Sequence, residues 1–507
     1  MTTNENKFQQ IISHAKEYGF VFASSEIYDG LSAVYDYGPY GSELKKNIRD
    51  YWWKSMTQMN ENIVGIDAAI FMHPLTWKAS GHVDNFSDPM IDNKDSQKRY
   101  RVDHLIEGYI DELKQKAIHE SGLNFSGSTL PIVETSFSEL ARHPDFIKAV
   151  ALQDEFESLI SEDDFAGLKK LIEDNNIKCS VSGTSNWTDV RQFNLMFSTE
   201  IGSVAEEAST IYLRPETAQG IFVNFLNVQK TARMKIPFGI AQTGKAFRNE
   251  IVARQFIFRM REFEQMEMQF FIRPGTQKEW YEYWKETRLQ WHLSLGIPKE
   301  KYRYHDHVKL AHYADAALDI EYEFPFGFKE VEGIHSRTDF DLQNHQLLSG
   351  KKLQYFDNEI NQNYIPYVIE TSIGLDRMFL LILSESYEDE TLTKEDGSTD
   401  TRALMRIPAK IAPIKLAILP LTKKDGLPEI AREVMNECKN YFRCFYEEKD
   451  TIGKRYRRMD AIGTPFCITI DHQTKEDQTV TIRYRDTMLQ ERIPVNNVKE
   501  IVLNNIM

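Results

Sequence analysis

The sequence predicts an α+β protein with a sheet-based core, a helical insertion and a smaller C-terminal α/β domain. The chain has 507 residues, which exceeds the usual size of a single domain. A strand-rich texture begins after Cys179, a helix-prone stretch precedes it, and strands alternate with helices after residue 412. We therefore expect a core over residues 1–102 and 179–407, an insertion over 103–178, and a C-terminal domain over 412–507.

Two helices are expected before the insertion. Residues 8–18 have a short amphipathic pattern. Residues 42–59 carry apolar side chains every three or four positions, at Leu44, Ile48, Trp52, Met56 and Met59. Core packing is the ordinary reason for such a stripe, and an oligomer interface is the alternative. Residues 103–178 are helix-prone and acidic in places, which predicts an inserted helical module.

The remaining elements follow from short apolar runs bounded by turn residues. Expected strands lie at 191–197, 209–213, 238–247 and 256–272, a helix at 280–295, strand and turn at 322–342, and a strand running into an apolar helix at 364–383. Residues 388–401 are polar, which predicts a loop before a linker bracketed by Pro408 and Pro413. In the C-terminal domain strands are expected at 414–419, 442–447, 466–470 and 479–485, and helices at 428–440 and 495–503.

Composition excludes several classes of protein. Hydrophobic residues make up 41% of the chain and aromatic residues 12%, which suffices for well-packed cores and excludes a disordered chain. No run reaches the roughly 18 apolar residues of a membrane helix, and the polar N-terminus lacks a signal-peptide pattern. Because so long a chain has only four cysteines, the sequence predicts a cytoplasmic protein with reduced thiols.

The charge distribution is uneven along the chain. The net charge of −15 argues against a protein that coats nucleic acid. The run Lys454–Arg458 is nevertheless the strongest basic cluster, and it lies in the C-terminal domain. Such a patch can bind a polyanion locally. A solvated charged face is the ordinary alternative.

One stretch, from Phe247–Glu250 through Arg259–Glu267, has an unusual density of charge for a pair of strands. It places arginines and glutamates among aromatic side chains in a strand–loop–strand pattern. A planar guanidinium binds phosphate or carboxylate bidentately, so arginines on a rigid sheet suit an oxyanion site. A salt-bridged sheet surface is the alternative interpretation, and it is the one that we keep for Arg254, Arg261, Glu262 and Glu264.

These strings resemble the motifs of class II aminoacyl-tRNA synthetases. The charged stretch is similar to the second motif of that class, Glu370–Arg377 resembles the third, and the helix over 42–59 running on to Pro74 resembles the first. The strings Asp36–Pro39, Leu213–Gly220 and Gly333–Leu342 are similar to those of homodimeric, bacterial-like glycyl-tRNA synthetases. The resemblance implies a catalytic core with an antiparallel sheet flanked by helices, followed by an anticodon-binding α/β domain.

The resemblance also implies substrates and roles. ATP and glycine would form glycyl-adenylate and pyrophosphate, and glycine would then pass to the 3′-terminal adenosine of tRNA(Gly). Arg248 and Arg377 would be the catalytic residues, with no general base because the substrate carboxylate is already a nucleophile. A homodimer is implied, with Mg²⁺ as the cofactor bound with ATP and Glu330 and Glu370 as its ligands. ATP would contact Arg248, Asn249, Glu250, Phe258, Arg259, Phe263, Glu330, Val331, Gly374 and Arg377, with adenine between Phe263 and Arg377.

Glycine recognition would use a cluster of acidic groups around the ammonium. By resemblance the glycine site comprises Arg101, Glu216, Glu267, Arg337, Glu370 and Ser372. Several carboxylates close together are costly when no cation is bound, so at least one raised pKa is expected among them. Two alternatives remain open: a salt bridge between Glu216 and Arg214, and a helix N-cap role for Ser372.

The same resemblance suggests RNA contacts and one departure from the family. Contacts with tRNA are expected from Lys454, Arg455, Arg457, Arg458, Arg483 and Arg485. Many relatives carry two CxxC pairs that form a zinc site flanking the insertion. Here Asn93–Ser96 replaces the first pair, and Cys179–Ser182 retains one thiol, so no structural zinc is expected.

Weaker signals allow other interpretations. His305, His307 and His312 have spacing that a metal could use, although a hydrogen-bonded polar cluster is favoured. A non-catalytic relative acting as a nucleic-acid-binding accessory subunit is the main rival function, but it would be expected to lose the phosphate-binding arginines. A ligase for free amino acids is a second rival, and it would not need the C-terminal domain.

Overall fold

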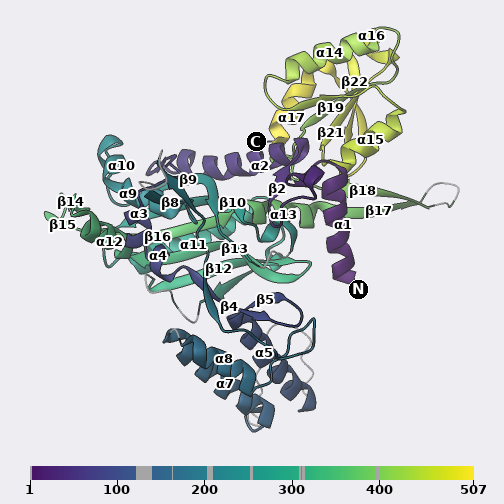
Figure 1. Ribbon diagram of the computed structural model, residues 1–507. Coiled ribbons are helices and arrows are strands. Elements are labelled where there is room, and N and C mark those ends of the chain that lie inside the picture. The colour runs from purple at the N-terminus through teal and green to yellow at the C-terminus, as the bar shows by residue number, and fades with distance from the viewer. Residues whose placement is uncertain are drawn as a thin grey trace. The chain divides into compact units, whose positions relative to one another are not determined.

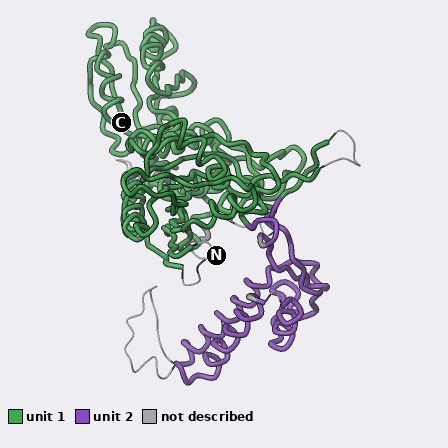
Figure 2. Tube along the Cα trace, turned by 90° about the vertical axis from the view of Figure 1, so that its left-hand side faces the viewer, with its two compact units in different colours: residues 1–80, 197–248, 253–507 green, residues 81–196, 249–252 purple. Residues whose placement is uncertain are grey.

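The fold is described from a computed structural model that divides into two compact units, shown in Figure 2. The first unit comprises residues 1–80, 197–248 and 253–507, and the second comprises 81–196 and 249–252. The structure describes residues 3–121, 140–162, 164–202, 209–251, 255–307, 310, 314–393, 397 and 399–506. Within these ranges no helix is long and apolar enough to cross a membrane.

A seven-stranded sheet forms the centre of the first unit (Figure 1). Its strand order is β11-β12-β13-β16-β10-β9-β3, antiparallel except for the parallel pair of β3 with β9. The strands are β3 (Ile63–Gly65), β9 (Phe238–Phe247), β10 (Glu262–Ile272), β11 (Tyr302–Asp306), β12 (Ala316–Phe324), β13 (Gly327–Thr338) and β16 (Tyr367–Gly374). This architecture confirms the expected fold class.

Alternation along β10 separates an apolar face of the sheet from a polar one. Met266, Met268 and Phe270 are buried in the main hydrophobic core. The residues that alternate with them are Gln265, Glu267 and Gln269, which point to the opposite face. The apolar face packs against the helices α2 (Pro39–Trp53), α11 (Gln277–Leu293) and α13 (Leu375–Ser386).

The apolar stripe predicted for residues 42–59 belongs to this core over most of its length. Leu44, Ile48, Trp52 and Met56 are fully buried. Met59 is 70% exposed, because the helix widens into a π-helical turn over Lys54–Gln58 that rotates the stripe. Core packing therefore explains four of the five side chains.

Two short helices cover one end of the polar face. The helices α9 (Ala218–Val223) and α10 (Phe225–Thr231) pack Phe222 and Phe225 against Phe271 of β10. Glu267 and Gln269, farther along the same face, are also buried, at 2% and 0% exposure. The smaller elements of the unit are α1 (Thr3–Glu17), β1 (Val21–Ala23), β2 (Tyr35–Tyr37), α3 (Pro74–Ala79), β7 (Ser198–Ile201), β8 (Ser209–Tyr212), α12 (Phe340–Ser349), β14 (Tyr355–Asp357) and β15 (Gln362–Tyr364).

The second unit is wider than the predicted insertion of 103–178, because it carries its own sheet. Strand β4 (Ser87–Asn93) pairs with both β5 (Lys98–Arg101) and β6 (Arg191–Asn194), so the residues flanking the helices belong to the same unit. Its core joins Ile91 and Trp187 to the helices. These helices are α4 (His82–Asn85), α5 (Val102–Glu120), α7 (Pro144–Ser161) and α8 (Phe165–Asp174).

The C-terminal part of the first unit is an α/β domain with the strand order β20-β19-β21-β22-β23. Strands β19 (Leu416–Pro420), β20 (Cys444–Tyr446) and β21 (Phe466–Ile470) are parallel, and β22 (Thr479–Tyr484) and β23 (Gln490–Pro494) continue the sheet antiparallel. Its helices are α14 (Leu427–Cys438), α15 (Ile452–Ala461), α16 (His472–Asp477) and α17 (Val498–Ile506).

Two local expectations were wrong. Residues 388–401, expected as a loop, lie in a hairpin of β17 (Tyr387–Thr393) and β18 (Thr399–Met405). Its charged residues pair across the hairpin, as Glu390 does with Arg402, and Arg402 also pairs with Asp460 of the C-terminal domain. The strand expected over 256–272 begins only at Glu262, and Phe256–Phe258 forms a 3₁₀ turn.

Candidate active site

The polar face of the sheet aligns predicted glycine-site residues in two neighbouring rows. In the first row, Glu267 of β10 lies opposite Ser372 of β16, which lies opposite Gly333 of β13. In the second row, Glu370 of β16 lies between Gln269 and His335. Directly opposite residues in antiparallel strands share a face, so these side chains converge without any loop.

A single amide group separates the two buried carboxylates of this face. The Nε2 atom of Gln269 donates to Glu267 Oε1 at 3.0 Å and to Glu370 Oε2 at 2.6 Å. The Thr217 hydroxyl donates to the other oxygen of Glu267. Burial and the negative charges of Glu370 and Glu216 nevertheless raise the pKa of Glu267 well above its usual value. The expectation of a raised pKa in this cluster is therefore confirmed.

Glu370 has the opposite electrostatic setting. Burial favours its neutral form, but Arg337 and His335 outweigh that effect and lower the pKa of Glu370. The Arg337 Nη1 atom lies 2.9 Å from Glu370 Oε2, and His335 Nδ1 lies 2.8 Å from Oε1. The rest of the Arg337 guanidinium forms two bonds with Asp341. Glu370 is thus the ionised member of the pair.

The segment before α9 brings Glu216 into the same network. Gln219 donates to Glu216 Oε1 at 2.9 Å and to Asp341 Oδ1 at 2.9 Å, and its own carbonyl oxygen lies 2.8 Å from His345 Nε2. The Arg214 guanidinium donates to the main-chain carbonyls of Lys245 and Ala68. Arg214 therefore holds backbone, in contrast to the alternative in which it pairs with Glu216.

Ser372 lies in strand β16 and receives a hydrogen bond from Gln265 at 3.3 Å. The following helix α13 begins at Leu375, and its N-cap residue is Gly374. The alternative that Ser372 caps this helix is therefore wrong.

Two arginines and two phenylalanines mark the predicted ATP end of the sheet. Arg248 directly follows β9, donates to the Pro215 carbonyl at 3.1 Å, and lies over the Phe263 ring at 5.3 Å. Arg377, in the first turn of α13, lies over Phe258 at 4.4 Å and forms an ion pair with Glu330 at 2.8 Å. Phe263 and Arg377, which are expected on either side of adenine, thus each contact another side chain in this structure. Arg259 is half-buried, Val331 is buried in the main core, and Gly374 ends β16.

Asp376 anchors the start of α13 and so fixes the position of Arg377. Its carboxylate accepts from the Tyr37 hydroxyl, from the Lys45 ammonium at 2.6 Å and from the Glu264 backbone N–H at 2.7 Å. Burial is the main reason why the pKa of Tyr37 is raised, and the Asp376 carboxylate adds to it. Three segments distant in sequence therefore meet at one buried anion.

Charged residues that had no predicted substrate role form ion pairs or backbone contacts. Glu262 pairs with Lys245 at 2.7 Å, Glu264 pairs with Arg49 at 2.9 Å, and Arg261 donates to the Ser32 carbonyl. The salt-bridge interpretation therefore holds for both glutamates. Arg254 lies outside the described residues.

Three predicted site residues belong to the second unit. Arg101 forms ion pairs with Asp88 at 3.0 Å and Asp103 at 2.6 Å. Asn249 donates its backbone N–H to Leu195 at 2.8 Å, and the charge of Glu250 contributes to the raised pKa of Arg101. Within the second unit these residues are neighbours.

The two expected magnesium ligands differ in how well they suit a cation. Glu330 is half-exposed and pairs only partly with Arg377, whereas both oxygens of Glu370 already accept from His335, Gln269 and Arg337. Of the two, Glu330 is therefore the carboxylate that would suit a magnesium ion bound with ATP.

The predicted RNA contacts divide into exposed and buried groups. Lys454 and Arg457 are exposed on α15, and Arg458 is half-exposed with an ion pair to Asp450. Arg455, Arg483 and Arg485 are only 2%, 5% and 3% exposed. Arg455 donates to the carbonyls of Pro420 and Glu447. The last three therefore hold the domain together, which differs from the expectation that they contact RNA.

The four positions that correspond to the zinc ligands of relatives converge in the second unit. Ser182 donates its hydroxyl to Asn93 Oδ1 at 2.9 Å, and the Ser96 backbone N–H donates to the same oxygen at 3.0 Å. The Cys179 thiol lies 3.3 Å from the Ser96 hydroxyl and 3.0 Å from that of Tyr100. Burial opposes ionisation, yet hydrogen bonds from Ser182, Ser96 and Tyr100 lower the pKa of Cys179 to about 6. We call these four positions the knuckle. Hydrogen bonds hold the knuckle together where a metal would do so in such relatives.

The histidine pattern forms acidic pairs. His305 pairs with Glu321 at 3.2 Å and His307 with Asp319 at 2.9 Å, while His312 lies outside the described residues. Among the residues that the structure describes, three ligand atoms approach one another closely enough for a metal only at Glu120, His143 and Asp145, where Lys116 already pairs with Asp145.

Sequence reasoning missed the residues that organise the acidic cluster. Gln269, Thr217, Gln219 and Asp341 each contact a predicted site residue directly. The alternation of Gln265, Glu267 and Gln269 with apolar residues was a usable signal, because such polar residues in a central strand must face a polar site. Nothing in the spacing of Gln219 and Asp341 indicates their partnership.

Comparison with known proteins agrees with this arrangement. Residues 197–386 match the class II tRNA synthetase core domain (G, H, P, S and T), 88–195 match the glycyl-tRNA synthetase insertion domain 1, and 415–505 match an anticodon binding domain. The chain is 51% identical over 499 residues to a glycine–tRNA ligase of Chlorobaculum tepidum, covering 98% of this chain and 100% of the relative. It is 49% identical to that of Macrococcus caseolyticus (98% of each chain) and 47% identical to that of Treponema denticola (97% and 96%). The chain therefore belongs to the glycine–tRNA ligase family of class II aminoacyl-tRNA synthetases.

Proposed function

We propose that the protein activates glycine with ATP to glycyl-adenylate and pyrophosphate, and then transfers glycine to the 3′-terminal adenosine of tRNA(Gly). Membership of the family makes it an aminoacyl-tRNA ligase. The observation that supports the residue assignment best is the polar sheet face. At one end this face carries the carboxylates of Glu267, Glu370 and Glu216, which would surround an ammonium group. At its other end it carries arginines.

Activation would depend on charge compensation and positioning. Arg248 contacts the α-phosphate and the glycine carboxylate, which lowers the cost of bringing two anions together. Arg259 and Arg377 hold the γ-phosphate. Adenine stacks between Phe263 and Arg377. Its binding would therefore replace the contacts of Arg248 with Phe263 and of Arg377 with Phe258.

Glycine would be held by its two charged ends. Glu216, Glu267 and the hydroxyl of Ser372 receive the ammonium, and Glu370 completes the acidic environment while remaining paired with Arg337. Larger amino acids are excluded because the space around the Cα atom is filled, since binding alone discriminates a methyl group by only about 1–3 kcal/mol.

Further assignments concern the cofactor and the assembly. Mg²⁺ bound with ATP would neutralise phosphate charge, and Glu330 is the side chain that suits it. Exposed residues of α15, namely Lys454, Arg457 and Arg458, would contact tRNA. We also propose a homodimer and a cytoplasmic location.

The decisive experiment is ATP–pyrophosphate exchange with each of the twenty amino acids, followed by charging of tRNA(Gly). Stimulation by glycine alone is the expected result. Stimulation by alanine or serine in place of glycine would contradict the pocket assignment. If no amino acid stimulated exchange, the accessory-subunit interpretation would return.

A further inference from the structure

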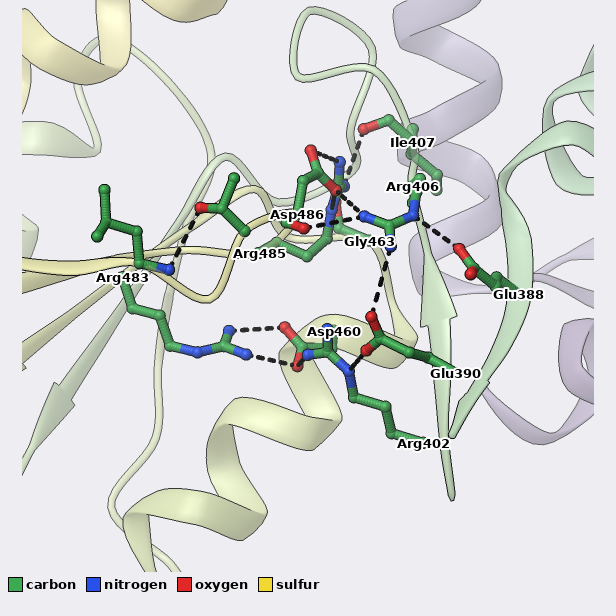
Figure 3. Close-up of polar contacts among 12 residues, drawn as sticks. Glu388, Glu390, Arg402, Arg406, Ile407, Asp460, Gly463, Arg483, Arg485 and Asp486 are labelled. Atoms are coloured by element: carbon green, nitrogen blue, oxygen red, sulfur yellow. Dashed lines mark hydrogen bonds and ion pairs between the residues drawn. The ribbon is translucent and has the colours of Figure 1, made fainter. Parts of the chain in front are cut away.

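A buried ion-pair cluster joins the hairpin β17–β18 to the C-terminal domain, and Figure 3 shows its members. The Asp460 carboxylate, at the end of α15, receives Arg402 Nη1 of β18 at 2.5 Å. It also receives both terminal nitrogens of Arg483 on β22, at 2.8 and 3.0 Å. Arg402 is held from its other side by Glu390 of β17. One carboxylate thus links an element of the core to two elements of the C-terminal domain.

The burial of this cluster separates it from ordinary surface ion pairs. The side chains of Arg402 and Asp460 are only 3% and 1% exposed. The guanidinium groups of Arg402 and Arg483 face the carboxylates of Asp460 and Glu390, and Arg406 also lies 3.6 Å from Glu390. Removing one partner from a buried pair leaves an uncompensated charge and is strongly destabilising. Replacing a single residue of the cluster is therefore expected to disturb its other members.

Further contacts hold the same junction. Arg485 donates to the carbonyls of Ile407 at 2.9 Å and Gly463 at 2.7 Å, and Arg406 donates to the Asp486 carbonyl at 3.1 Å. His14 of α1 lies 2.8 Å from the Ala461 carbonyl, at the end of α15. These side chains therefore bind backbone carbonyls both before the linker, at Ile407, and in the C-terminal domain, at Gly463 and Asp486.

The chain path gives this junction a functional context. Helix α13 begins next to Arg377 of the ATP end and continues directly into β17, the strand that carries Glu390. Helix α15 ends at Asp460 and Ala461 and exposes Lys454 and Arg457 nearer its start. A single helix therefore has one end clamped to the catalytic core and displays the cations proposed for tRNA contact.

We propose that Arg402 is a positioning residue for the transfer step: through Asp460 it sets the place of the tRNA-binding face of α15 relative to the catalytic core. This inference rests on the proposed tRNA contacts of α15. It goes beyond them because it assigns a role in charging to residues that touch no substrate. We expect amino-acid activation to be independent of the clamp, because none of the proposed ATP and glycine contacts lies in the C-terminal domain.

The test variant is Arg402→Leu, because the Asp460–Arg483 pair stays intact and Glu390 is partly exposed. The full-length protein is assayed for glycine-dependent ATP–pyrophosphate exchange, for charging of full-length tRNA(Gly), and for charging of a minihelix that carries only the acceptor stem. We expect unchanged exchange and minihelix charging, with kcat for full-length tRNA lowered about tenfold or more, since a small misplacement far from the chemistry can have such an effect.

A conservative variant and an exposed control make the result specific. Arg402→Lys keeps the charge but loses the fork geometry, and should recover part of the lost kcat. Arg443→Leu removes an arginine that is 62% exposed and that pairs with Glu43 of the core at 3.7 Å. Its charging should be unchanged, because exposed pairs contribute little.

Two outcomes would overturn the proposal: full-length charging that is unchanged in Arg402→Leu, or an equal loss with full-length tRNA and minihelix. If Arg402→Leu fails to fold, the ratio of full-length to minihelix charging in Arg402→Lys decides instead, and an unchanged ratio counts against the proposal. Failure of the proposed function itself is separate, because the unaltered protein would then show no glycine-dependent exchange.

Discussion

The Arg337 guanidinium lies 2.9 Å from the Glu370 carboxylate, and this ion pair makes two neighbouring acids differ in charge. Arg337 and His335 favour ionised Glu370, while Glu267, which shares the amide donor of Gln269, has a raised pKa. The arrangement thus avoids two uncompensated anions, and a bound ammonium would meet one ionised carboxylate and one that must release a proton.

Glycine affinity should therefore depend on pH through Glu267. Because burial and the charges of Glu370 and Glu216 raise its pKa, Glu267 is protonated at the lower end of the pH range and ionises as pH rises. Binding of the ammonium favours the ionised form, so the KM for glycine in the exchange assay should fall with rising pH while the KM for ATP changes less. In Glu267→Gln this glycine-specific pH dependence should disappear, and its persistence would contradict the assignment.

Replacing Gln269 by leucine should destabilise the central sheet. The variant removes the one donor that Glu267 and Glu370 share, and leaving buried acceptors without it costs about 1–3 kcal/mol. Denaturant unfolding with amide hydrogen exchange in β10 and β16 measures the loss. Gln290→Leu, on the exposed side of α11, should change stability by less than about 0.5 kcal/mol.

Arg248→Ala should abolish activation without affecting tRNA binding. The side chain follows strand β9 and lies over Phe263, so its loss removes charge from the proposed phosphate site and leaves the C-terminal domain intact. We expect exchange to fall by at least about 10²-fold, as for loss of a preorganised charge-stabilising donor. Equal loss of exchange and tRNA affinity would show that Arg248 is structural.

The stability of the second unit should rise with pH between the folded and unfolded pKa values of Cys179. Hydrogen bonds lower the folded value from the ordinary 9.0 to about 6, so the ionised thiol favours the folded unit. This contribution is complete above the unfolded pKa and is lost as pH falls through the folded pKa. Hydrogen exchange in β4 and β5, corrected for intrinsic rates, measures it.

A matched pair of variants tests the cause of that pH dependence. Cys179→Ala should remove it. Cys438→Ala should leave it unchanged, because burial raises the pKa of Cys438 to about 11, outside the same pH window. An identical pH profile for Cys179→Ala and the unaltered protein would mean that the thiol does not ionise in the knuckle.

Tests of RNA binding should distinguish the exposed cations of α15 from an exposed cation elsewhere in the C-terminal domain. Removing Lys454 and Arg457 together should weaken tRNA binding and lower the salt slope of log K by about 1 for each phosphate that the variant no longer neutralises. Exchange should be unaffected. The exposed Lys475 on α16, which donates to the Asp425 carbonyl, is the control. If Lys475→Ala had the same effect, the attraction would be a general charge effect.

Much of the fold and part of the site follow from local pattern. The short apolar runs predicted most strands of the central sheet, and the pattern over residues 364–383 predicted a strand that runs into an apolar helix. Arg248, Glu267 and Glu370 lie on one sheet as expected, because their strands are long and their side chains alternate regularly. The hairpin over 387–405 escaped prediction, since its charged residues pair across the two strands and, through Arg402, with the distant Asp460.

By itself, therefore, the sequence determined the class of the protein, the strands and helices of its core, and the residue types of its active site. Only the tertiary structure decided which charges pair with each other. Arg455, Arg483 and Arg485 are cations, as Lys454 and Arg457 are. Folding nevertheless buries these three arginines against carbonyls and carboxylates. The reason is physical: a guanidinium binds RNA, substrate or its own chain equally well, and burial alone selects the partner.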